Sequence, residues 1–437
     1  MNSLKTPVPG KTTKSKSIAG EKSLSPRKKG LKSTAVAAFI IFLGINAMLM
    51  TASPGTDQFD QYKFPYKGWA WWLMKDLNAT DATYDAAILG SSLTVSALNS
   101  ADATHYQENL DLVHYHKSRL FDEKLAEKTG VAVNTFNLST PGQMPSDALM
   151  TIKAMIKTGQ KPNLVVYGIA PRDFIDSELA GPQDTEPFTY LSRVVDIGAL
   201  EDKIFTSPLD KINRALQKNL YFYKHAVDLQ MTGYSDYESF MDRFVPAPPS
   251  SKNKPFTYWD RVKLLPEYKK GEFHPQANMC NPDDLSKPSE YIDNSIEYVH
   301  RYKKPNPVAF ETQMFFLNQL SEFTAKNGIT LVVVNMPITL DNLKLLKQEH
   351  YDKYMERVRQ FASASANTEF YDMNNHDVFT KPDFHDGVHM NARGGIKFID
   401  LLTDRLAASG TLNRAFPDPK NLKFSTRDIN EKKSTEQ

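Results

Sequence analysis

The chain has 437 residues and a formal net charge of +2, and it is 41% hydrophobic and 24% charged. These values are ordinary for a globular protein and exclude a fibrous, collagen-like or wholly disordered chain. The single cysteine, Cys280, excludes a disulfide framework and any metal site built from several cysteines. One cysteine is compatible with either redox compartment, so it leaves the localisation open.

The N-terminal 33 residues form a strongly basic tail. Residues 1–33 hold nine Lys or Arg and one acid, so the tail carries +8 and the rest of the chain −6. The tail is rich in Ser, Thr, Gly and Pro, which predicts disorder. A basic tail can bind nucleic acid, but this one has no aromatic residue and the body is acidic. We therefore predict no nucleic-acid partner.

The tail is followed by an uncharged segment, whose centre, Ala35–Met50, is almost wholly apolar. A helix of about 20 residues spans about 30 Å, the thickness of a bilayer core. We predict a single transmembrane anchor over residues 34–52, with the tail in the cytoplasm and the main domain periplasmic or extracellular, because the basic flank lies on the N-terminal side. A cleaved signal peptide is the alternative, and the long basic region disfavours it.

Residues 53–80 are predicted to connect the membrane anchor to the main domain. Three tryptophans, Trp69, Trp71 and Trp72, lie in this segment. Tryptophan is enriched at membrane interfaces, so these side chains would sit among lipid headgroups. The alternative is that they pack on the domain, and the sequence leaves both open.

The rest of the chain alternates short apolar runs with amphipathic stretches. This rhythm predicts an α/β fold with a parallel sheet covered by helices on both faces. The predicted domain is made of residues 81–173 and 307–412, and residues 413–437 form a C-terminal tail. Strands are expected at 84–90, 131–139, 164–170, 329–337 and 368–373, and helices at 105–128, 147–157, 308–326, 341–364 and 391–410.

Residues 174–306 interrupt the α/β rhythm. The segment is too long for a structureless loop inside a compact domain. It contains a stretch of expected helices, residues 190–230, and a part rich in proline and aromatic residues. We interpret it as an insertion that acts as a lid or a platform.

Polar residues with catalytic potential follow the ends of the predicted strands, where ligands bind in open parallel sheets. Ser92 follows the first strand, and Asp386 and His389 precede the last helix. Serine can act as a nucleophile, histidine as its base and aspartate as the group that orients the imidazole. The backbone N–H groups of Ser92 and Gly142 would stabilise an oxyanion.

These blocks resemble the SGNH (GDSL-type) hydrolase superfamily over residues 84–173 and 328–410. Gly90-Ser91-Ser92-Leu93 stands where that family has Gly-Asp-Ser-Leu, Gly142 matches its oxyanion glycine, and Asp386 with His389 matches its last block. The resemblance implies a three-layer, flavodoxin-like parallel sheet, with Ser92, His389 and Asp386 as catalytic residues. It also implies no cofactor and no metal.

The sequence departs from that family in two blocks. Ser91 replaces the usual aspartate, a variation that membrane-anchored, extracytoplasmic relatives such as DltD-like and alginate-acetylation-like proteins tolerate. The third block lacks its oxyanion asparagine and has Arg172 nearby. Arg172, and with it Ser91, would then bind the oxyanion or an anionic group of the substrate. The alternative is that Arg172 and Asp173 form a structural ion pair.

The sequence thus predicts an ester hydrolase or O-acyltransferase that acts on a cell-surface polysaccharide or acylated polymer, with a membrane acyltransferase as a candidate partner. The alternative is a non-catalytic binding or assembly component of a cell-envelope polysaccharide modification or export system. A metal site is a further alternative, disfavoured because Pro382 and Gly387 make the segment a loop. Its ligands would come from His376, Asp383, His385, Asp386 and His389.

Overall fold

The computed structural model describes most of the chain outside its two ends and the middle of the insertion. The chain divides into two compact units, Met1–Ser53 and Pro54–Gln437. The predictions for the two tails, for residues 53–67 of the connector and for most of residues 230–279 lie outside the described residues, and the limits of the domains stay predictions. The described residues are 34–52, 68–179, 181–226, 229, 240, 243, 280–281 and 284–417.

The first unit contains the apolar helix α1 (Thr34–Ala52), which has 19 residues and no charged side chain. It is long and apolar enough to cross a membrane, a property that a signal sequence near an N-terminus shares. The Asn46 amide donates to the carbonyl of Phe42 one turn earlier, at 2.8 Å, so this polar group is bonded within the helix. The helix is consistent with single-pass anchoring, and its orientation stays a prediction.

Five parallel strands form the sheet of the second unit. They are β1 (Ala86–Gly90), β2 (Thr135–Asn137), β3 (Leu164–Ile169), β6 (Thr330–Asn335) and β7 (Thr368–Asp372), in the order β2-β1-β3-β6-β7. Counted along the chain this order is 2-1-3-4-5, that of flavodoxin-like doubly wound sheets, with the switch point between β1 and β3. Each predicted strand range contains one of these strands, and segments from both sides of the insertion contribute to one sheet.

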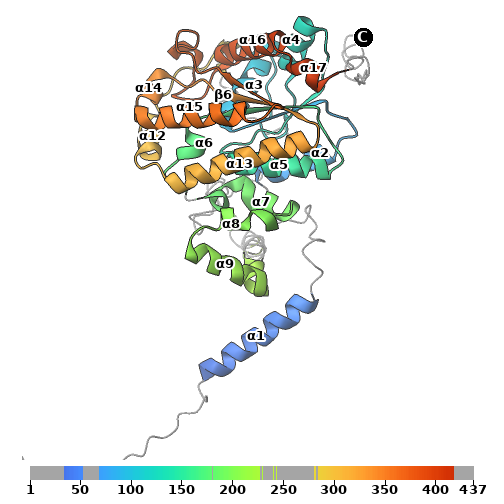
Figure 1. Ribbon diagram of the computed structural model, residues 1–437, viewed down its shortest axis with the longest axis vertical. Helices are drawn as coiled ribbons and strands as arrows, with labels where there is room; N and C mark the ends of the chain where they lie inside the picture. Colours follow the sequence, from blue (N-terminus) through green and yellow to red (C-terminus); the bar gives the residue numbers. More distant parts are fainter. Residues whose placement is uncertain are drawn as a thin grey trace, which may run out of the picture. The chain divides into compact units, whose positions relative to one another are not determined.

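Helices cover both faces of the sheet, as predicted (Figure 1). One face carries the mutually packed helices α3 (Ser92–Tyr106), α4 (Arg119–Thr129) and α16 (Ala392–Ala408). The other carries α5 (Pro145–Lys157), α13 (Pro307–Lys326) and α15 (Gln348–Ser363). Every residue of β1, β3 and β6 is therefore buried, which explains their unbroken apolar sequences.

The prediction of one helix over residues 105–128 is wrong. The helix that follows β1 is α3, which begins at Ser92 and ends at Tyr106, and α4 begins only at Arg119. Most of α3 is buried between the sheet and α16, so its sequence lacks the polar face that marks an amphipathic helix. The predicted helix over 341–364 is likewise two helices, α14 (Leu340–Leu343) and α15.

The described parts of the insertion form two groups of elements. The first includes α7, which packs on α2 (Trp69–Asn78) and α5. The second contains a hairpin whose strand β5 packs on α3 and α16, beside the end of the sheet where β1 stops. The elements are α6 (Arg172–Ile175), η3 (Pro182–Asp184), α7 (Glu186–Val194), η4 (Gly198–Leu200), α8 (Glu201–Ile204), α9 (Pro208–Asn219), α10 (Tyr221–Lys224), β4 (Cys280–Asn281), β5 (Asp284–Pro288) and α12 (Ser295–Tyr302).

The tryptophans of the connector belong to the domain. Trp71 and Trp72 are buried on α2, and Trp69 packs against the same core. The alternative of packing on the domain is therefore confirmed for Trp71 and Trp72, and a place among lipid headgroups is wrong for them. Lys75 lies over both of these rings, 5.1 Å and 4.4 Å from their centroids.

Candidate active site

A sharp turn between β1 and α3 exposes Ser92. Gly90 ends the strand at φ +154°, and a Cβ there would lie 2.1 Å from Thr94 Oγ1, so the turn requires glycine. Ser91 is buried and extended, and Ser92 is the first residue of α3. The N–H groups of a first helical turn lack partners within the helix and attract negative charge. The serine hydroxyl is therefore held where an anion is stabilised.

Ser92, His389 and Asp386 are linked by two short hydrogen bonds. His389 Nε2 lies 2.8 Å from Ser92 Oγ, and His389 Nδ1 lies 2.7 Å from Asp386 Oδ2. The His389 side chain is 19% exposed and that of Asp386 12%, so the site is recessed but open to solvent. The three residues are brought together although 297 positions separate Ser92 from His389.

The Asp386 carboxylate is fixed within its own loop. Its Oδ1 accepts hydrogen bonds from the amides of Val388 and His389, at 2.9 and 2.8 Å. Burial alone would raise the pKa of Asp386, but the bonds and charge of His389 and the bond from Val388 outweigh it and leave the pKa below its usual value. Asp386 is therefore ionised at neutral pH and can accept a hydrogen bond from His389 Nδ1, an arrangement that would leave Nε2 as the acceptor facing Ser92 Oγ.

The loop that carries Gly142 is attached to the end of β1. Thr140 N donates to the Gly90 carbonyl at 3.0 Å, and Gly90 N donates to the buried Gln143 side chain at 2.7 Å. Gly142 has φ +76°, and no atom lies within 4 Å of the position of a Cβ. Its amide has no acceptor in the part of the chain that the structure describes, so it is free to bind a ligand. Gln143 was missed; its only sequence signal is its place beside the turn.

Arg172 forms its salt bridge with Asp176 and not with Asp173, so the predicted alternative of an Arg172–Asp173 ion pair is wrong. Arg172 Nε donates to Asp176 Oδ2 at 3.1 Å, and Arg301 Nη1 contacts the same buried oxygen at 2.6 Å. The terminal nitrogens of Arg172 have no acceptor among the described residues. Burial raises the pKa of Tyr298. The positive charge of Arg172 lowers this pKa, and the negative charge of Asp386 raises it further. Arg172 thus lies at the start of α6, close to the carboxyl end of β3, with donors to spare.

The last part of the insertion contacts the loop that carries Asp386 and His389. Asn294 Oδ1 accepts from Gly387 N at 3.0 Å, and Ile292 N donates to the His385 carbonyl at 2.7 Å. Ser289 Oγ lies 2.8 Å from His385 Nδ1. A Cβ on Gly387 would lie 2.8 Å from Asn294 Oδ1, so the fit depends on glycine. These supports cannot be predicted from the sequence, because single polar side chains in an irregular segment form no pattern.

The residues of the metal alternative are not arranged as ligands. Asp383 accepts from Lys397 and pairs with Arg393, at 2.6 and 2.9 Å. His385 bonds Ser289, while Asp386 and His389 bond each other. Among the described residues, no group of three or more His, Cys, Asp or Glu side chains is placed to hold a metal ion.

Ser91, beside Ser92, is buried and makes no side-chain capping bond on α3.

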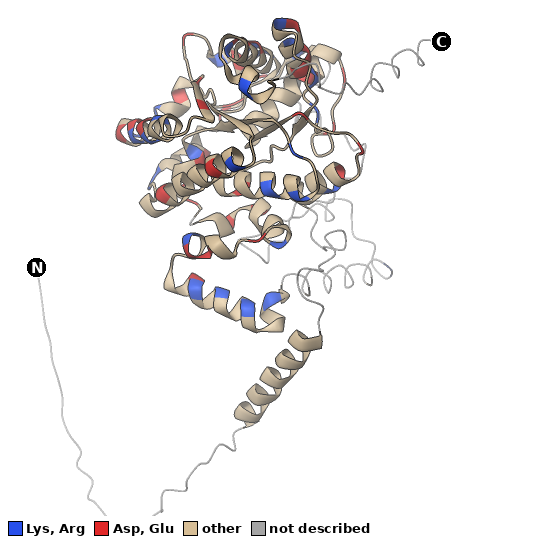
Figure 2. Ribbon diagram, turned by 45° about the vertical axis from the view of Figure 1, so that its right-hand side comes forward, with Lys and Arg blue, Asp and Glu red and all other residues tan. Residues whose placement is uncertain are grey.

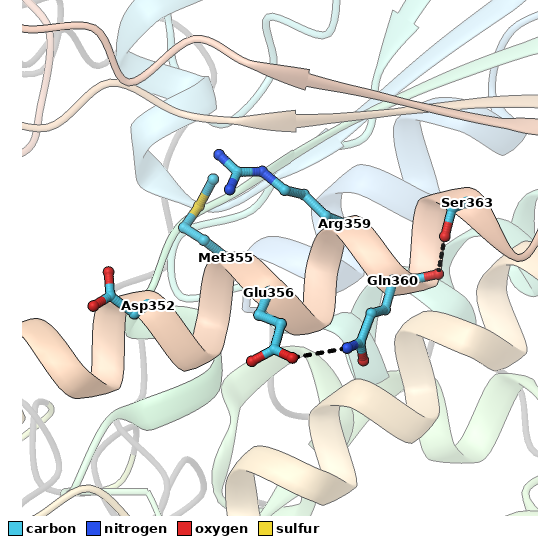
Figure 3. Close-up of a pocket in the computed structure, with 6 residues that line it drawn as sticks. All are labelled: Asp352, Met355, Glu356, Arg359, Gln360 and Ser363. Carbon is cyan, nitrogen blue, oxygen red and sulfur yellow. Dashed lines mark hydrogen bonds between the residues drawn. The ribbon is translucent and has the colours of Figure 1, made fainter.

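A surface hollow, shown in Figure 3, lies away from these residues. It runs along α15 and is lined by Asp352, Met355, Glu356, Arg359, Gln360 and Ser363. Gln360 in this hollow donates to Glu356 at 3.0 Å, so neighbouring side chains of one helix satisfy each other. The hollow includes none of the predicted site residues.

Asp173 is expected to make stability depend on pH. Its carboxyl is buried, accepts from Ala170 N and leaves Oδ1 without a partner among the described groups. Burial raises its pKa from 3.8 to about 7. Because the pKa of Asp173 is higher in the folded than in the unfolded chain, the protonated carboxyl favours the folded state. This contribution to the free energy of unfolding is fully present below the unfolded pKa and is lost as the pH rises through 7. The same cause raises the pKa of Asp147 to about 7 and of Asp122 and Glu186 to about 8.

Asp173→Asn should therefore flatten the pH dependence of unfolding. Asparagine resembles the protonated acid but does not titrate, so the variant should lose less stability between pH 5 and 7, by up to about 1 kcal/mol per pH unit. Urea unfolding followed by the fluorescence of the buried Trp71 and Trp72 measures this. The exposed Asp196→Asn is the control and should keep the wild-type slope. Parallel curves for wild type and Asp173→Asn would contradict the assignment.

The fold and the site together define a parallel α/β protein with a serine–histidine–aspartate relay at the carboxyl edge of its sheet. A family model described as a protein of unknown function, DUF1574, matches residues 115–406. The match covers about two thirds of the 437 residues, so the chain belongs to this family. The matched range includes Gly142, Arg172, Asp386 and His389 and begins after Ser92. The chain matches no curated protein.

Proposed function

We propose that this protein is a membrane-anchored, SGNH-like ester hydrolase or O-acyltransferase that works through an acyl-enzyme on Ser92. The observation that carries the proposal is the relay from Ser92 Oγ to His389 Nε2 and from His389 Nδ1 to Asp386, at 2.8 and 2.7 Å. The strand order and the position of each block at a strand end support the SGNH assignment. The apolar helix α1 supports an extracytoplasmic place for the domain.

In the first half of the reaction, Ser92 Oγ attacks the carbonyl carbon of an ester and its proton passes to His389 Nε2. Asp386, which remains ionised, stabilises the imidazolium and keeps its orientation. The negative charge on the former carbonyl oxygen is stabilised by the amides of Ser92 and Gly142. His389 then gives its proton to the leaving alcohol, the ester C–O bond breaks, and the acyl group remains on Ser92.

In the second half, water or an acceptor hydroxyl attacks the acyl carbon and gives its proton to His389 Nε2. The bond between the acyl carbon and Ser92 Oγ breaks, and His389 returns the proton to Ser92 Oγ. Water yields a carboxylic acid, and an acceptor hydroxyl yields a new ester. We assign to Arg172 the role of the missing asparagine, because it closely follows β3 and its terminal nitrogens have no acceptor within the described chain. It would add a charged donor to the oxyanion or bind an anionic group of the substrate. Cell-surface polysaccharides and acylated polymers are the substrates that such a domain would meet.

The alternative of a non-catalytic binding or assembly component predicts a broken serine–histidine contact or a blocked site. The 2.8 Å contact and the partial exposure of Ser92 and His389 argue for the catalytic alternative. A membrane acyltransferase as partner would supply acyl groups to the same serine, and it belongs to the proposal only if transfer rather than hydrolysis occurs.

Labelling with a fluorophosphonate probe tests the proposal. The full chain in detergent should be labelled on Ser92, because the probe reacts with a serine whose hydroxyl is activated by a base. Ser92→Ala should lose at least about nine-tenths of the labelling, and Ser363→Ala, in the hollow along α15, should keep most of it. Mass spectrometry of the labelled peptide identifies the site. Equal labelling of wild type and Ser92→Ala would overturn the proposed function.

A further inference from the structure

Helix α9 presents an apolar stripe to the outside of the domain. It has 12 residues, and none of them is buried. Leu209 is 63% exposed and Ile212 58%, and the half-buried Leu216, with Leu220 just after the helix, continues this side at intervals of three or four residues. These four residues are the α9 stripe. The next helix, α10, adds two exposed aromatic side chains, Phe222 and Tyr223, just beyond its end.

The charged side of α9 faces the domain. Arg214 Nη2 lies 2.6 Å from Glu201 Oε1 on α8, and Lys218 bonds the other oxygen of Glu201. A surface helix of a soluble domain normally buries its apolar side and exposes its charges. In α9, ion pairs hold the charged side against α8. Leu209 and Ile212 of the stripe face outward, and none of the described residues buries them.

Charge and chain connection both favour a lipid surface as that partner. Residues 203–224 contain five Lys or Arg and one acid, Asp210, and Figure 2 shows basic residues along α9. The chain between α1 and Gly68 is residues 53–67, which extend to at most about 50 Å. This tether enters the domain at α2, which packs against α7, and α7 leads through α8 into α9. A bilayer that holds α1 would keep the domain close to its surface, because only residues 53–67 separate the two.

We infer that the α9 stripe inserts into the interfacial layer of the membrane, and that the basic residues Lys211 on α9 and Lys224 on α10 attract this part of the domain to anionic headgroups. Helices of this kind combine a large apolar side with lysine and arginine, and they lie in the plane of the interface. The inference rests on α1 as an anchor and is independent of the chemistry proposed for Ser92. It gives the first part of the insertion the role of a second, peripheral membrane contact.

Fluorescence quenching of single labelled cysteines tests the inference in the full chain. In a Cys280→Ser background, Ile212→Cys is labelled with the environment-sensitive dye NBD, and the protein is placed in nanodiscs that contain anionic lipid. We expect blue-shifted emission and at least about twofold quenching by lipids that carry a nitroxide near the headgroup. Ile296→Cys on α12, where Ile296 is 73% exposed, is the matched control and should stay in water, without quenching. Adding Lys211→Glu and Lys224→Glu should reduce the quenching at position 212.

Three outcomes would overturn the inference. The first is a dye at position 212 that emits as in water. The second is blue-shifted emission without quenching by lipid, which would mean that a second copy, another protein or another part of this chain covers the stripe. The third is equal quenching at positions 212 and 296, which would mean that the domain has no preferred side. Labelling of Ser92 by the fluorophosphonate probe, measured in parallel, distinguishes failure of this inference from failure of the proposed function.

Discussion

His389→Gln is expected to lower kcat on an acetyl ester by about 10³-fold or more. Loss of one member of such a relay removes the effect of the whole unit, and only substrate binding and oxyanion stabilisation remain. Glutamine keeps polar atoms on the loop but cannot take the proton from Ser92 Oγ, which now lies 2.8 Å from His389 Nε2. Steady-state hydrolysis of p-nitrophenyl acetate by the full chain in detergent measures the change.

The control for this experiment is His385→Gln, on the same loop. His385 bonds Ser289 and has no hydrogen bond to Ser92 or Asp386, so its loss should change kcat by less than about tenfold. Equal losses in both variants would mean that any disturbance of the loop stops turnover and that His389 has no special role. Turnover at the wild-type rate by His389→Gln would contradict the mechanism.

The parts of the site that the sequence predicts lie where secondary structure dictates position. Buried strands of parallel sheets have apolar sequences, so their positions can be predicted. Their carboxyl ends meet at one edge of the sheet, and this places Ser92, Gly142 and Arg172, which follow three of the strands, at that edge. Asp386 and His389 belong to a short loop before an amphipathic helix. Asn391 supports this boundary, because its Oδ1 accepts from Arg393 N and Gly394 N at the start of α16.

The parts that the sequence does not predict depend on contacts between distant segments. Asn294 and Ser289 come from the irregular end of the insertion, and their partners lie about 95 positions further along. The ion pair of Arg172 shows the same limit, since its nearest acid in sequence is Asp173 but its partner is Asp176. Tertiary contacts account for the difference: Asp173 accepts from Ala170 N, whereas Asp176 is shared with Arg301, which comes from α12. No periodicity in the sequence reports such a meeting.

These contacts change the interpretation of the insertion. The sequence leaves a lid and a platform as equal alternatives for residues 174–306. Residues 289–294 contact the His385–His389 loop through backbone and side-chain bonds, which favours a supporting role for this part. The segment that includes α9 differs, because its elements pack toward α2 and α5 and expose an apolar stripe. One insertion thus contains a part that positions the His385–His389 loop and a part suited to a membrane surface.

The second large effect is expected from Gly395→Ala. Alanine in place of glycine within a helix normally stabilises by about 1 kcal/mol. At Gly395, however, a Cβ would lie 2.1 Å from the carbonyl oxygen of Ala97 and 3.0 Å from its carbon, where α16 crosses α3. Because the obstacle is backbone, no side-chain rotation relieves it, and the two helices must separate. We expect a loss of about 3 kcal/mol in the free energy of unfolding.

This separation should also weaken the site, because α3 begins with Ser92 and α16 begins three residues after His389. A shift between the two helices lengthens the Ser92–His389 contact, so Gly395→Ala should slow fluorophosphonate labelling even in the fraction that stays folded. Gly130→Ala is the control: its φ is +69°, nothing lies within 4 Å of a Cβ there, and it should cost about 1 kcal/mol without slowing the labelling. Urea midpoints and labelling rates of both variants separate the two effects. Equal losses of stability in the two variants would show that α16 and α3 can separate at little cost in free energy. Unchanged labelling in Gly395→Ala would show that the Ser92–His389 contact does not depend on how closely these helices pack.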